Sequence, residues 1–252
     1  MHRSIPADYA SLMTELRYLP DNDDVSTFEA TVEEATDDYI VLDGTHFYPE
    51  GGGQPPDHGR LDWPSGAADV VDVQKEYGDV RHYLGTVNGE LPSKGAEAEA
   101  VIDWERRQAL RRMHTAQHVV SKIVLDEFGA QTAGNQIHVG RSRIDFEPAD
   151  FSDDDVTLIE GWTNTVIRND LPVEKMEMPR AEAEEKTPDG RGLLDLIPDH
   201  VDPLRMVKIG DLDLCPCGGT HVDQLREVGP IRITNRTSKG ADVDRIEFEL
   251  VN

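Results

Sequence analysis

Two short segments, far apart in the sequence, carry side chains well suited to bind a metal ion. The first is His114-Thr115-Ala116-Gln117-His118, and the second is Cys215-Pro216-Cys217-Gly218-Gly219-Thr220-His221. On a helix, two residues four apart lie on one face, about 5–6 Å from each other, which is close enough to bind one ion. His114, His118, Cys217 and His221 together offer three imidazoles and a thiolate, and this set suits Zn²⁺ better than Mg²⁺ or Ca²⁺, which prefer oxygen ligands.

Each segment taken alone also has an ordinary structural interpretation. Histidines spaced by four occur on many helix surfaces, and a buried thiol beside two glycines fits a tight turn. No glutamate follows His114, so the helix lacks the general base of the HExxH metalloproteases. The combination of the two segments is what favours a metal site.

The cysteine content indicates the redox environment. Cys215 and Cys217 are the only cysteines, and Pro216 alone separates them. A disulfide across one residue is strained, so we expect a reduced, cytoplasmic protein whose thiols bind metal or react.

A long helix is predicted to carry the two histidines. Asp103 is a suitable N-cap, residues 104–128 contain neither Pro nor Gly, and Gly129 is a typical C-terminal signal. Four arginines precede His114, and two of them, Arg107 and Arg111, fall on the same side of the helix as the histidines. This row is interpreted either as a phosphate-binding ridge that leads toward the metal or as a solvated, salt-bridged helix face.

Short strands are predicted upstream of this helix. Residues 28–32, 39–42, 70–73 and 98–102 are apolar or alternate with period two, and clusters of Gly, Pro and Asp separate them, which indicates a small antiparallel β-barrel. Downstream, helices are predicted at 155–169 and 181–185, an extended hairpin-like stretch at 136–146, and strands at 207–214, 231–236 and 243–250. No βαβ repeat appears, so the fold class is α+β. The predicted division is an N-terminal extension (1–20), a barrel domain with a Gly-rich loop (21–100) and a zinc-binding domain (101–252).

Three motifs in order resemble one family. Phe47-Tyr48-Pro49-Glu50-Gly51-Gly52-Gly53-Gln54-Pro55-Pro56-Asp57-His58-Gly59, then the helix motif, then Cys217-Gly218-Gly219-Thr220-His221-Val222 resemble the editing region of alanyl-tRNA synthetase. The chain looks most like the freestanding AlaX proteins of medium length, from about Met13 to its C-terminus. No segment resembles an aminoacylation domain, and none is expected in a chain of this length.

The resemblance implies a fold, a site and a reaction. The fold would be a barrel followed by an editing domain of the threonyl/alanyl-tRNA synthetase type, and the zinc ligands would be His114, His118, Cys217 and His221. The reaction would be hydrolysis of the ester between tRNA(Ala) and a wrong amino acid, serine or glycine, without ATP. Neither a membrane nor an obligate protein partner is expected. Editing of seryl-tRNA(Thr), and a non-catalytic zinc-stabilised tRNA-binding module, remain alternatives.

Some positions are open within this resemblance. Cys215 is an additional thiol that competes with Cys217 for zinc, and Cys217 is favoured because it keeps the family's spacing to His221. Thr115 and Gln117 are candidate catalytic residues, because many synthetase editing regions carry Thr at the second of these positions. In the Gly-rich loop, Gly51, Gly52, Gly53 and Gln54 are candidate contacts for the tRNA end, although the glycines also suit a simple strand turn.

The charge balance first argues against nucleic acid. The chain has 25 Lys plus Arg against 50 Asp plus Glu, a formal charge of −25, whereas nucleic-acid-binding surfaces are usually basic. Only seven of the basic residues are lysine and the other 18 are arginine. Acid spread along the whole chain, with little lysine, favours a high-salt cytoplasm over an ordinary acidic mesophilic protein, because molar salt screens a negative surface over about 3 Å. Together with the family resemblance, this indicates a halophilic archaeon.

Overall fold

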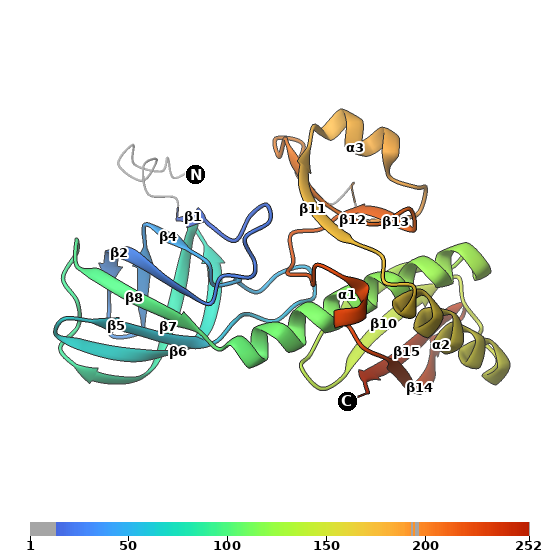
Figure 1. Cartoon of the computed structure of the whole chain (residues 1–252), viewed down its shortest axis with the longest axis horizontal. Helices are drawn as coiled ribbons and strands as arrows, with labels where there is room; N and C mark the ends of the chain where they lie inside the picture. The colour runs from blue at the N-terminus through green and yellow to red at the C-terminus, as the bar shows by residue number, and fades with distance from the viewer. Residues whose placement is uncertain (1–13, 193, 195–196, 252) are drawn as a thin grey trace, which may run out of the picture. The chain divides into compact units, whose positions relative to one another are not determined.

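A computed structural model describes residues 14–192, 194 and 197–251 of the chain (Figure 1). The chain divides into two compact units, residues 1–50 with 56–104, and residues 51–55 with 105–252. The Gly-rich residues 51–55 therefore belong to the second unit, whereas the sequence placed them in the barrel. The predicted extension lies outside the described residues up to residue 13, and its last part contributes strand β1.

The first unit contains an antiparallel barrel, as predicted. Its strands are β1 (Glu15–Leu16), β2 (Thr27–Ala35), β3 (Tyr39–Leu42), β4 (Gly44–Thr45), β5 (Gly59–Trp63), β6 (Gly66–Glu76), β7 (Asp79–Gly89) and β8 (Glu97–Ile102). Six of them close into a barrel in the order β2-β3-β7-β6-β5-β8, and β1 pairs with β4 in parallel beside it.

The barrel closes because its strands alternate between inward and outward side chains. In β8, Ala98, Ala100 and Ile102 are buried, while the alternate residues Glu97, Glu99 and Val101 are exposed. The small alanines share the barrel core with the large side chains of Leu61 and Trp63.

One polar side chain, His82 of β7, lies within this apolar interior. Its Nδ1 donates to the carbonyl oxygen of Ile40 at 3.0 Å, and its Nε2 lies 2.9 Å from the Thr45 hydroxyl. The ring also packs edge-on against Phe47. Burial lowers the pKa of His82 to about 4, so the ring is neutral in the folded protein at pH 7.

The second unit holds the remaining elements. They are α1 (Trp104–Phe128), β9 (Gln131–Gln136), β10 (Ser142–Glu147), α2 (Asp153–Arg168), β11 (Val173–Met178), α3 (Arg180–Lys186), β12 (Leu204–Ile209), β13 (Asp213–Pro216), the 3-10 helix η3 (Leu225–Glu227), β14 (Ile231–Gly240) and β15 (Val243–Leu250). This mixture of helices and antiparallel strands confirms the α+β class. None of the helices in the described residues is both long and apolar enough to cross a lipid bilayer.

Helix α1 has the predicted bounds. Gly129 follows it with φ +68°, and its N–H bonds to the Leu125 carbonyl, as expected of a glycine that ends a helix. Every residue from Met113 to Ser121 is buried, so this part of the helix has no solvated face. One side of α1 contributes Met113 and Val120 to the apolar core, which leaves the His114 and His118 side for other contacts.

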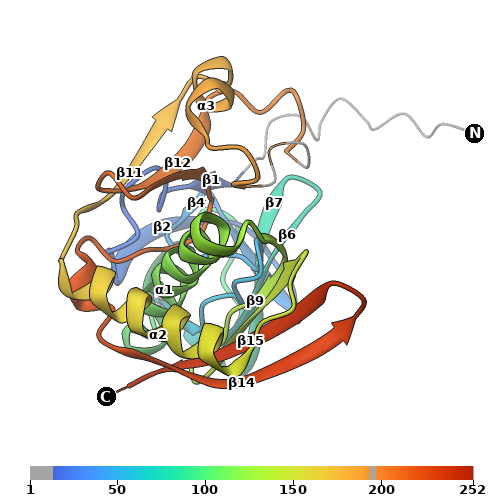
Figure 2. The ribbon, with the colours of Figure 1, turned by 90° about the vertical axis from the view of Figure 1, so that its right-hand side faces the viewer.

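Two helices and a four-stranded sheet form the main core of this unit. The sheet has the order β14-β15-β10-β9, and α1 and α2 cover one of its faces (Figure 2). Helix α2 begins two residues before the predicted start, because Ser152 is its N-cap. The Ser152 hydroxyl accepts from the Asp155 N–H and the Asp155 carboxylate accepts from the Ser152 N–H, forming a capping box that the prediction overlooked.

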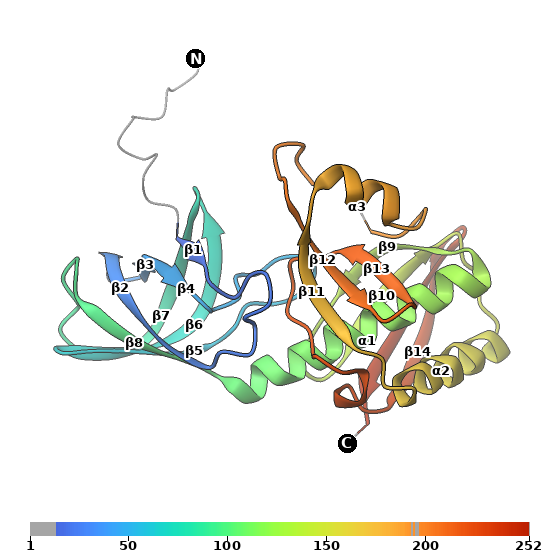
Figure 3. The same ribbon diagram turned by 45° about the horizontal axis from the view of Figure 1, so that its top comes forward.

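A second, three-stranded sheet, β11-β12-β13, is covered by α3 (Figure 3). The prediction of one strand over 207–214 is wrong, because a tight turn at Gly210, with φ +47°, divides it into β12 and β13. Strand β13 ends at Pro216, so the residue that follows it is Cys217.

We expect the stability of the chain to fall on acidification through His82. Its pKa is about 4 in the folded protein and about 6.5 when unfolded, so the unfolded chain binds more protons between these values. The free energy of unfolding should therefore fall by about 1.4 kcal/mol per pH unit below pH 6.5. In His82→Asn, which keeps a donor for Ile40, this part of the pH dependence should disappear.

Urea unfolding at pH 7, 6 and 5 in constant KCl measures this effect. His200→Asn makes the same change at an exposed site and serves as the control. Identical pH dependence in wild type and His82→Asn would show that His82 has no part in it.

Candidate metal centre

Helix α1 and the loop after β13 bring four metal-binding side chains together. His114 and His118 lie on one face of α1, and Cys217 and His221 lie on the loop that crosses this face. One donor atom from each of the four lies within 4.8 Å of the other three. The Cys217 Sγ is 3.5 Å from His114 Nε2 and 3.3 Å from His221 Nε2. A soft thiol and three imidazoles at these distances can hold a metal ion.

Arg205 of β12 holds the loop in place. Its Nη1 donates to the carbonyl oxygens of Cys217 and Gly219, each at 2.7 Å. Gly219 passes so close to the helix that a Cβ there would lie 2.1 Å from the His114 ring. Gly218, in contrast, faces open space.

The Nδ1 atom of each imidazole has a partner in the protein. Two of these contacts are simple: His114 Nδ1 donates to Gln54 Oε1 at 2.7 Å, and His221 Nδ1 lies 3.1 Å from the Thr115 hydroxyl. His118 Nδ1 faces the thiol of Cys215. Protonation of Nδ1 leaves Nε2 with its lone pair free, and in His114 and His221 the Nε2 atom is the one that faces Cys217.

Gln54 links the Gly-rich loop to this centre. Its Oε1 also accepts from the Thr220 N–H at 3.1 Å, and its Nε2 donates to the Thr220 hydroxyl at 2.9 Å. The loop makes a tight turn, with φ +57° at Gly52 and +83° at Gly53, which Gly tolerates best. The Gly53 carbonyl accepts from the Ile137 N–H. The predicted contact of Gly51, Gly52, Gly53 and Gln54 with the tRNA end stays a prediction.

The electrostatics of the group suit metal ligands. Burial lowers the pKa of His114 and of His221, which keeps both imidazoles neutral. Burial alone would raise the pKa of the Cys217 thiol, but the imidazoles of His114, His221 and His118 lower it well below its usual range. A thiolate and neutral imidazoles are the forms that coordinate metals.

His118 differs from the other two histidines. Burial opposes it, yet Cys215, Cys217 and the Asp213 carboxylate raise the pKa of His118 well above its usual value. Asp213 in turn is held below its usual pKa, although burial would raise it, because Arg191 and His118 bond to its carboxylate. Asp213 and Arg191 were not among the predicted site residues.

Two of the four arginines of α1, Arg107 and Arg111, are buried. Arg111 is 2% exposed, its Nε donates to the His221 carbonyl at 2.6 Å, and its Nη2 bonds to the Asp223 carboxylate, which also accepts from Lys175. Arg107 is 0% exposed. The sequence left a phosphate-binding ridge and a solvated, salt-bridged face as alternatives; in the structure Arg111 supports the backbone of the loop at His221, and contact of Arg107 or Arg111 with RNA stays a prediction.

The two candidate catalytic residues are both buried in the helix. The Thr115 hydroxyl bonds to the Arg111 carbonyl, accepts from the Val222 N–H and faces His221, so it supports the centre. The Gln117 amide donates to the Ser121 hydroxyl, which also accepts from Thr132 of β9. A catalytic role for Thr115 or Gln117 remains untested.

Cys215 and Cys217 face different nitrogens. Cys217 lies among the Nε2 atoms, whereas the Cys215 Sγ is 3.3 Å from the Nδ1 atom of His118. The two thiols are two residues apart at the end of β13, and Cys215 is buried whereas Cys217 is partly exposed. Cys217 is the one that belongs to the four-donor group.

Comparisons with known proteins agree with this architecture. Residues 8–106 match the model of tRNA synthetases class II (A), and residues 204–247 match that of the threonyl and alanyl tRNA synthetase second additional domain. The barrel and the α+β unit therefore define a chain with an editing domain of the synthetase type.

Relatives give the family. The alanyl-tRNA editing protein AlaX-M of Methanosarcina barkeri is 39% identical over 95% of this chain and 100% of its own length. AlaX-L of Pyrococcus horikoshii is 36% identical over 83% of this chain and 50% of its own length. The alanine–tRNA ligase of Methanopyrus kandleri is 39% identical over 86% of this chain, which spans 24% of the ligase. The chain belongs to the AlaX family of alanyl-tRNA editing proteins.

We expect Gly219→Ala to weaken metal binding while Gly218→Ala does not. The new methyl group at 219 would overlap the His114 ring, so His114 or the loop must move. Displacing one ligand should reduce zinc affinity by roughly tenfold or more. Gly218→Ala adds the same group in open space.

Competition with a chromogenic chelator measures the affinity of both variants, and circular dichroism checks their folding. Equal zinc affinity in the two variants would contradict the close approach of the loop to His114.

Proposed function

We propose that this chain is a zinc-dependent aminoacyl-tRNA deacylase that acts in trans on seryl- and glycyl-tRNA(Ala). The observation that carries the proposal is the convergence of His114, His118, Cys217 and His221. It occurs in a chain that matches proteins named alanyl-tRNA editing proteins over their whole length.

The donor distances support zinc as the metal. With Zn–S of about 2.3 Å and Zn–N of about 2.0–2.1 Å, tetrahedral coordination separates sulfur from nitrogen by roughly 3.6 Å. The two sulfur–nitrogen distances, 3.5 and 3.3 Å, are close to this value. His114, His118, Cys217 and His221 would hold the ion, which would supply Lewis acidity toward an ester carbonyl or a water molecule.

Access to the site favours the loop side. The three histidines are at most 4% exposed, whereas Cys217 is partly exposed and Gly218 beside it has open space. An aminoacyl ester would therefore approach past Cys217 and Gly218. Gln54, Thr115 and Arg111 keep the histidines and the loop in place behind them.

An editing enzyme is needed because of the physics of small amino acids. A synthetase pocket for alanine excludes serine poorly, since one hydroxyl group costs little binding energy, and the pocket cannot exclude the smaller glycine. A second site has to remove these errors after transfer to tRNA.

We expect the purified chain to release serine and glycine from tRNA(Ala) in molar KCl and to leave alanyl-tRNA(Ala) intact. His118→Ala should lose both zinc and activity, because it removes a ligand, whereas His200→Ala, at an exposed site, should keep both. Filter assays with labelled amino acids measure the release, and elemental analysis measures the zinc.

Other results would replace the proposal by one of its alternatives. Release of serine from tRNA(Thr) alone would indicate editing of that tRNA. Tight tRNA binding without any release would indicate a non-catalytic module. If His118→Ala kept its zinc and its rate, the assigned ligand set would be wrong.

The charge distribution predicts how salt affects this activity. The first unit carries 22 acidic against 6 basic residues and the second 28 against 19, so RNA contacts are proposed for the second unit. Molar KCl screens the acidic surface over about 3 Å and leaves little gain from counterion release.

Deacylation rate and circular dichroism at 0.1, 1 and 3 M KCl test this idea. We expect a shallow salt dependence above 1 M and loss of fold and activity at 0.1 M. A rate that peaks in dilute buffer would contradict the halophilic origin and leave the editing reaction untouched.

A further inference from the structure

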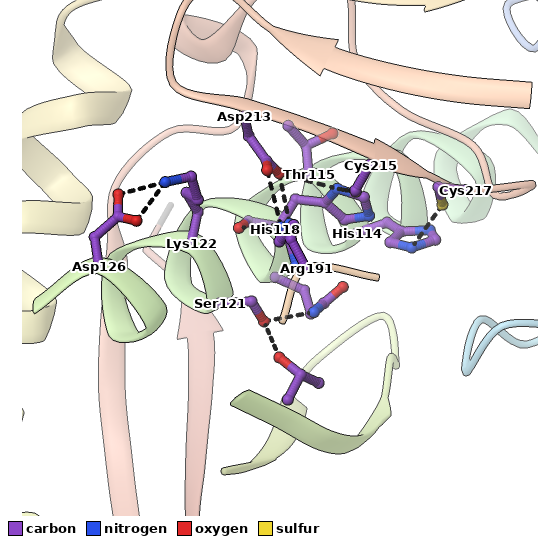
Figure 4. A network of polar contacts seen from close by, with 12 residues as sticks. His114, Thr115, His118, Ser121, Lys122, Asp126, Arg191, Asp213, Cys215 and Cys217 are labelled. Atoms are coloured by element: carbon purple, nitrogen blue, oxygen red, sulfur yellow. Dashed lines mark hydrogen bonds and ion pairs between the residues drawn. The ribbon is translucent and has the colours of Figure 1, made fainter. Parts of the chain in front are cut away.

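Behind His118 lies a polar cluster outside the four-donor group (Figure 4). The His118 Nδ1 faces two side chains of β13, the Cys215 Sγ at 3.3 Å and the Asp213 Oδ2 at 3.8 Å. These two residues alternate with Leu214 along the strand, so both point toward α1.

A buried arginine holds the carboxylate of this cluster. Arg191 Nε donates to Asp213 Oδ1 at 2.9 Å and its Nη2 donates to Oδ2 at 2.5 Å, so the pair is bidentate. The same Nη2 lies 3.2 Å from the backbone carbonyl oxygen of His118. The side chains of Arg191 and Asp213 are 7% and 0% exposed.

A buried ion pair of this kind contributes little net stability. Removing both charges from water costs about as much as their attraction returns, so an apolar pair of the same shape often serves stability as well. The position of this pair, in contact with a metal ligand through both its ring and its carbonyl, points to a role at the centre.

The cluster is unsuited to a second metal ion. One donor atom each of His118, Asp213 and Cys215 also lies within 4.8 Å of the other two. However, the Arg191 guanidinium already occupies both oxygens of Asp213, and its positive charge would oppose a cation at this place. Asp213 therefore remains available only to accept hydrogen bonds.

We propose that Asp213, clamped by Arg191, is the positioning residue of His118: its carboxylate faces Nδ1 at 3.8 Å and favours the proton on that nitrogen, which leaves Nε2 free for the metal. The inference rests on the proposed metal centre. The Cys215 sulfur is nearer to the same nitrogen, at 3.3 Å, but sulfur is a weak hydrogen-bond acceptor, so the negative charge of the Asp213 carboxylate is the stronger influence on the Nδ1 proton.

Zinc affinity of the full chain tests the proposal. Asp213→Asn should bind zinc about 10–100-fold more weakly. Asp126→Asn is the control. It makes the same change on α1, two turns after His118, at a carboxylate that forms an ion pair with Lys122. The zinc affinity of Asp126→Asn should stay within about twofold of wild type, and that of Cys215→Ala within about threefold. Loss of the carboxylate in Asp213→Asn should lower the affinity at least about tenfold.

Loss of the carboxylate has to be separated from the unpaired charge it leaves on Arg191. The double variant Arg191→Gln/Asp213→Asn keeps a neutral polar pair and should show the same weak zinc binding. Wild-type affinity in this double variant would overturn the proposal. So would a loss in Cys215→Ala as large as that in Asp213→Asn.

The tautomer of His118 can be read in the unmodified protein. In the zinc-loaded wild type, ¹⁵N spectra of the histidine rings should show a protonated Nδ1 and a metal-bound Nε2 for His118. The opposite assignment would overturn the proposal even if the variants fail to fold. A chain that binds zinc in this way but deacylates no tRNA would refute the proposed function and leave this inference standing.

Discussion

Three histidines and a cysteine can be buried together only if the second nitrogen of each imidazole also finds a partner. Gln54 supplies one partner, Thr115 another, and the cluster of Asp213 and Cys215 the third. An unpaired buried nitrogen would cost stability, and a wrong tautomer would turn a proton toward the centre. These partners come from the Gly-rich turn, α1 and β13. Burial of the three histidines therefore requires these three segments of the second unit to pack together.

The backbone around the centre is as constrained as its side chains. The absence of a Cβ at Gly219 allows the loop to approach the His114 ring, and Arg205 binds the loop through two carbonyl oxygens. Arg111 does the same for His221. The guanidinium groups of Arg205 and Arg111 thus fix the loop backbone through three carbonyl oxygens, and this positions the side chains of Cys217 and His221.

The acidity of the chain has a different meaning once the two units are separated. The barrel unit holds most of the negative charge excess, −16 of −25, whereas the second unit has 19 basic residues against 6 in the barrel unit. In molar salt, tRNA affinity would rest on stacking, shape and hydrogen bonds more than on counterion release. The net negative charge therefore lies mainly in the barrel unit, where it would oppose a nucleic acid less than in the unit proposed to bind it.

The sequence by itself determined the features that depend on local signals. Helix α1 was predictable because Asp103 and Gly129 delimit a stretch without Pro or Gly, and the shared helix face of His114 and His118 followed from their spacing. The barrel and the α+β class followed from strand periodicity.

Only the tertiary structure decided which residues form hydrogen bonds to the side chains of this candidate metal centre. Gln54 reaches His114 across 60 positions and Arg191 reaches Asp213 from a segment without regular pattern. Arg111 shares a helix face with the histidines, yet it turns to the His221 carbonyl instead of solvent. Periodicity tells which side of an element a residue occupies, but its partner depends on which other element packs there, and that is set by burial of the whole core.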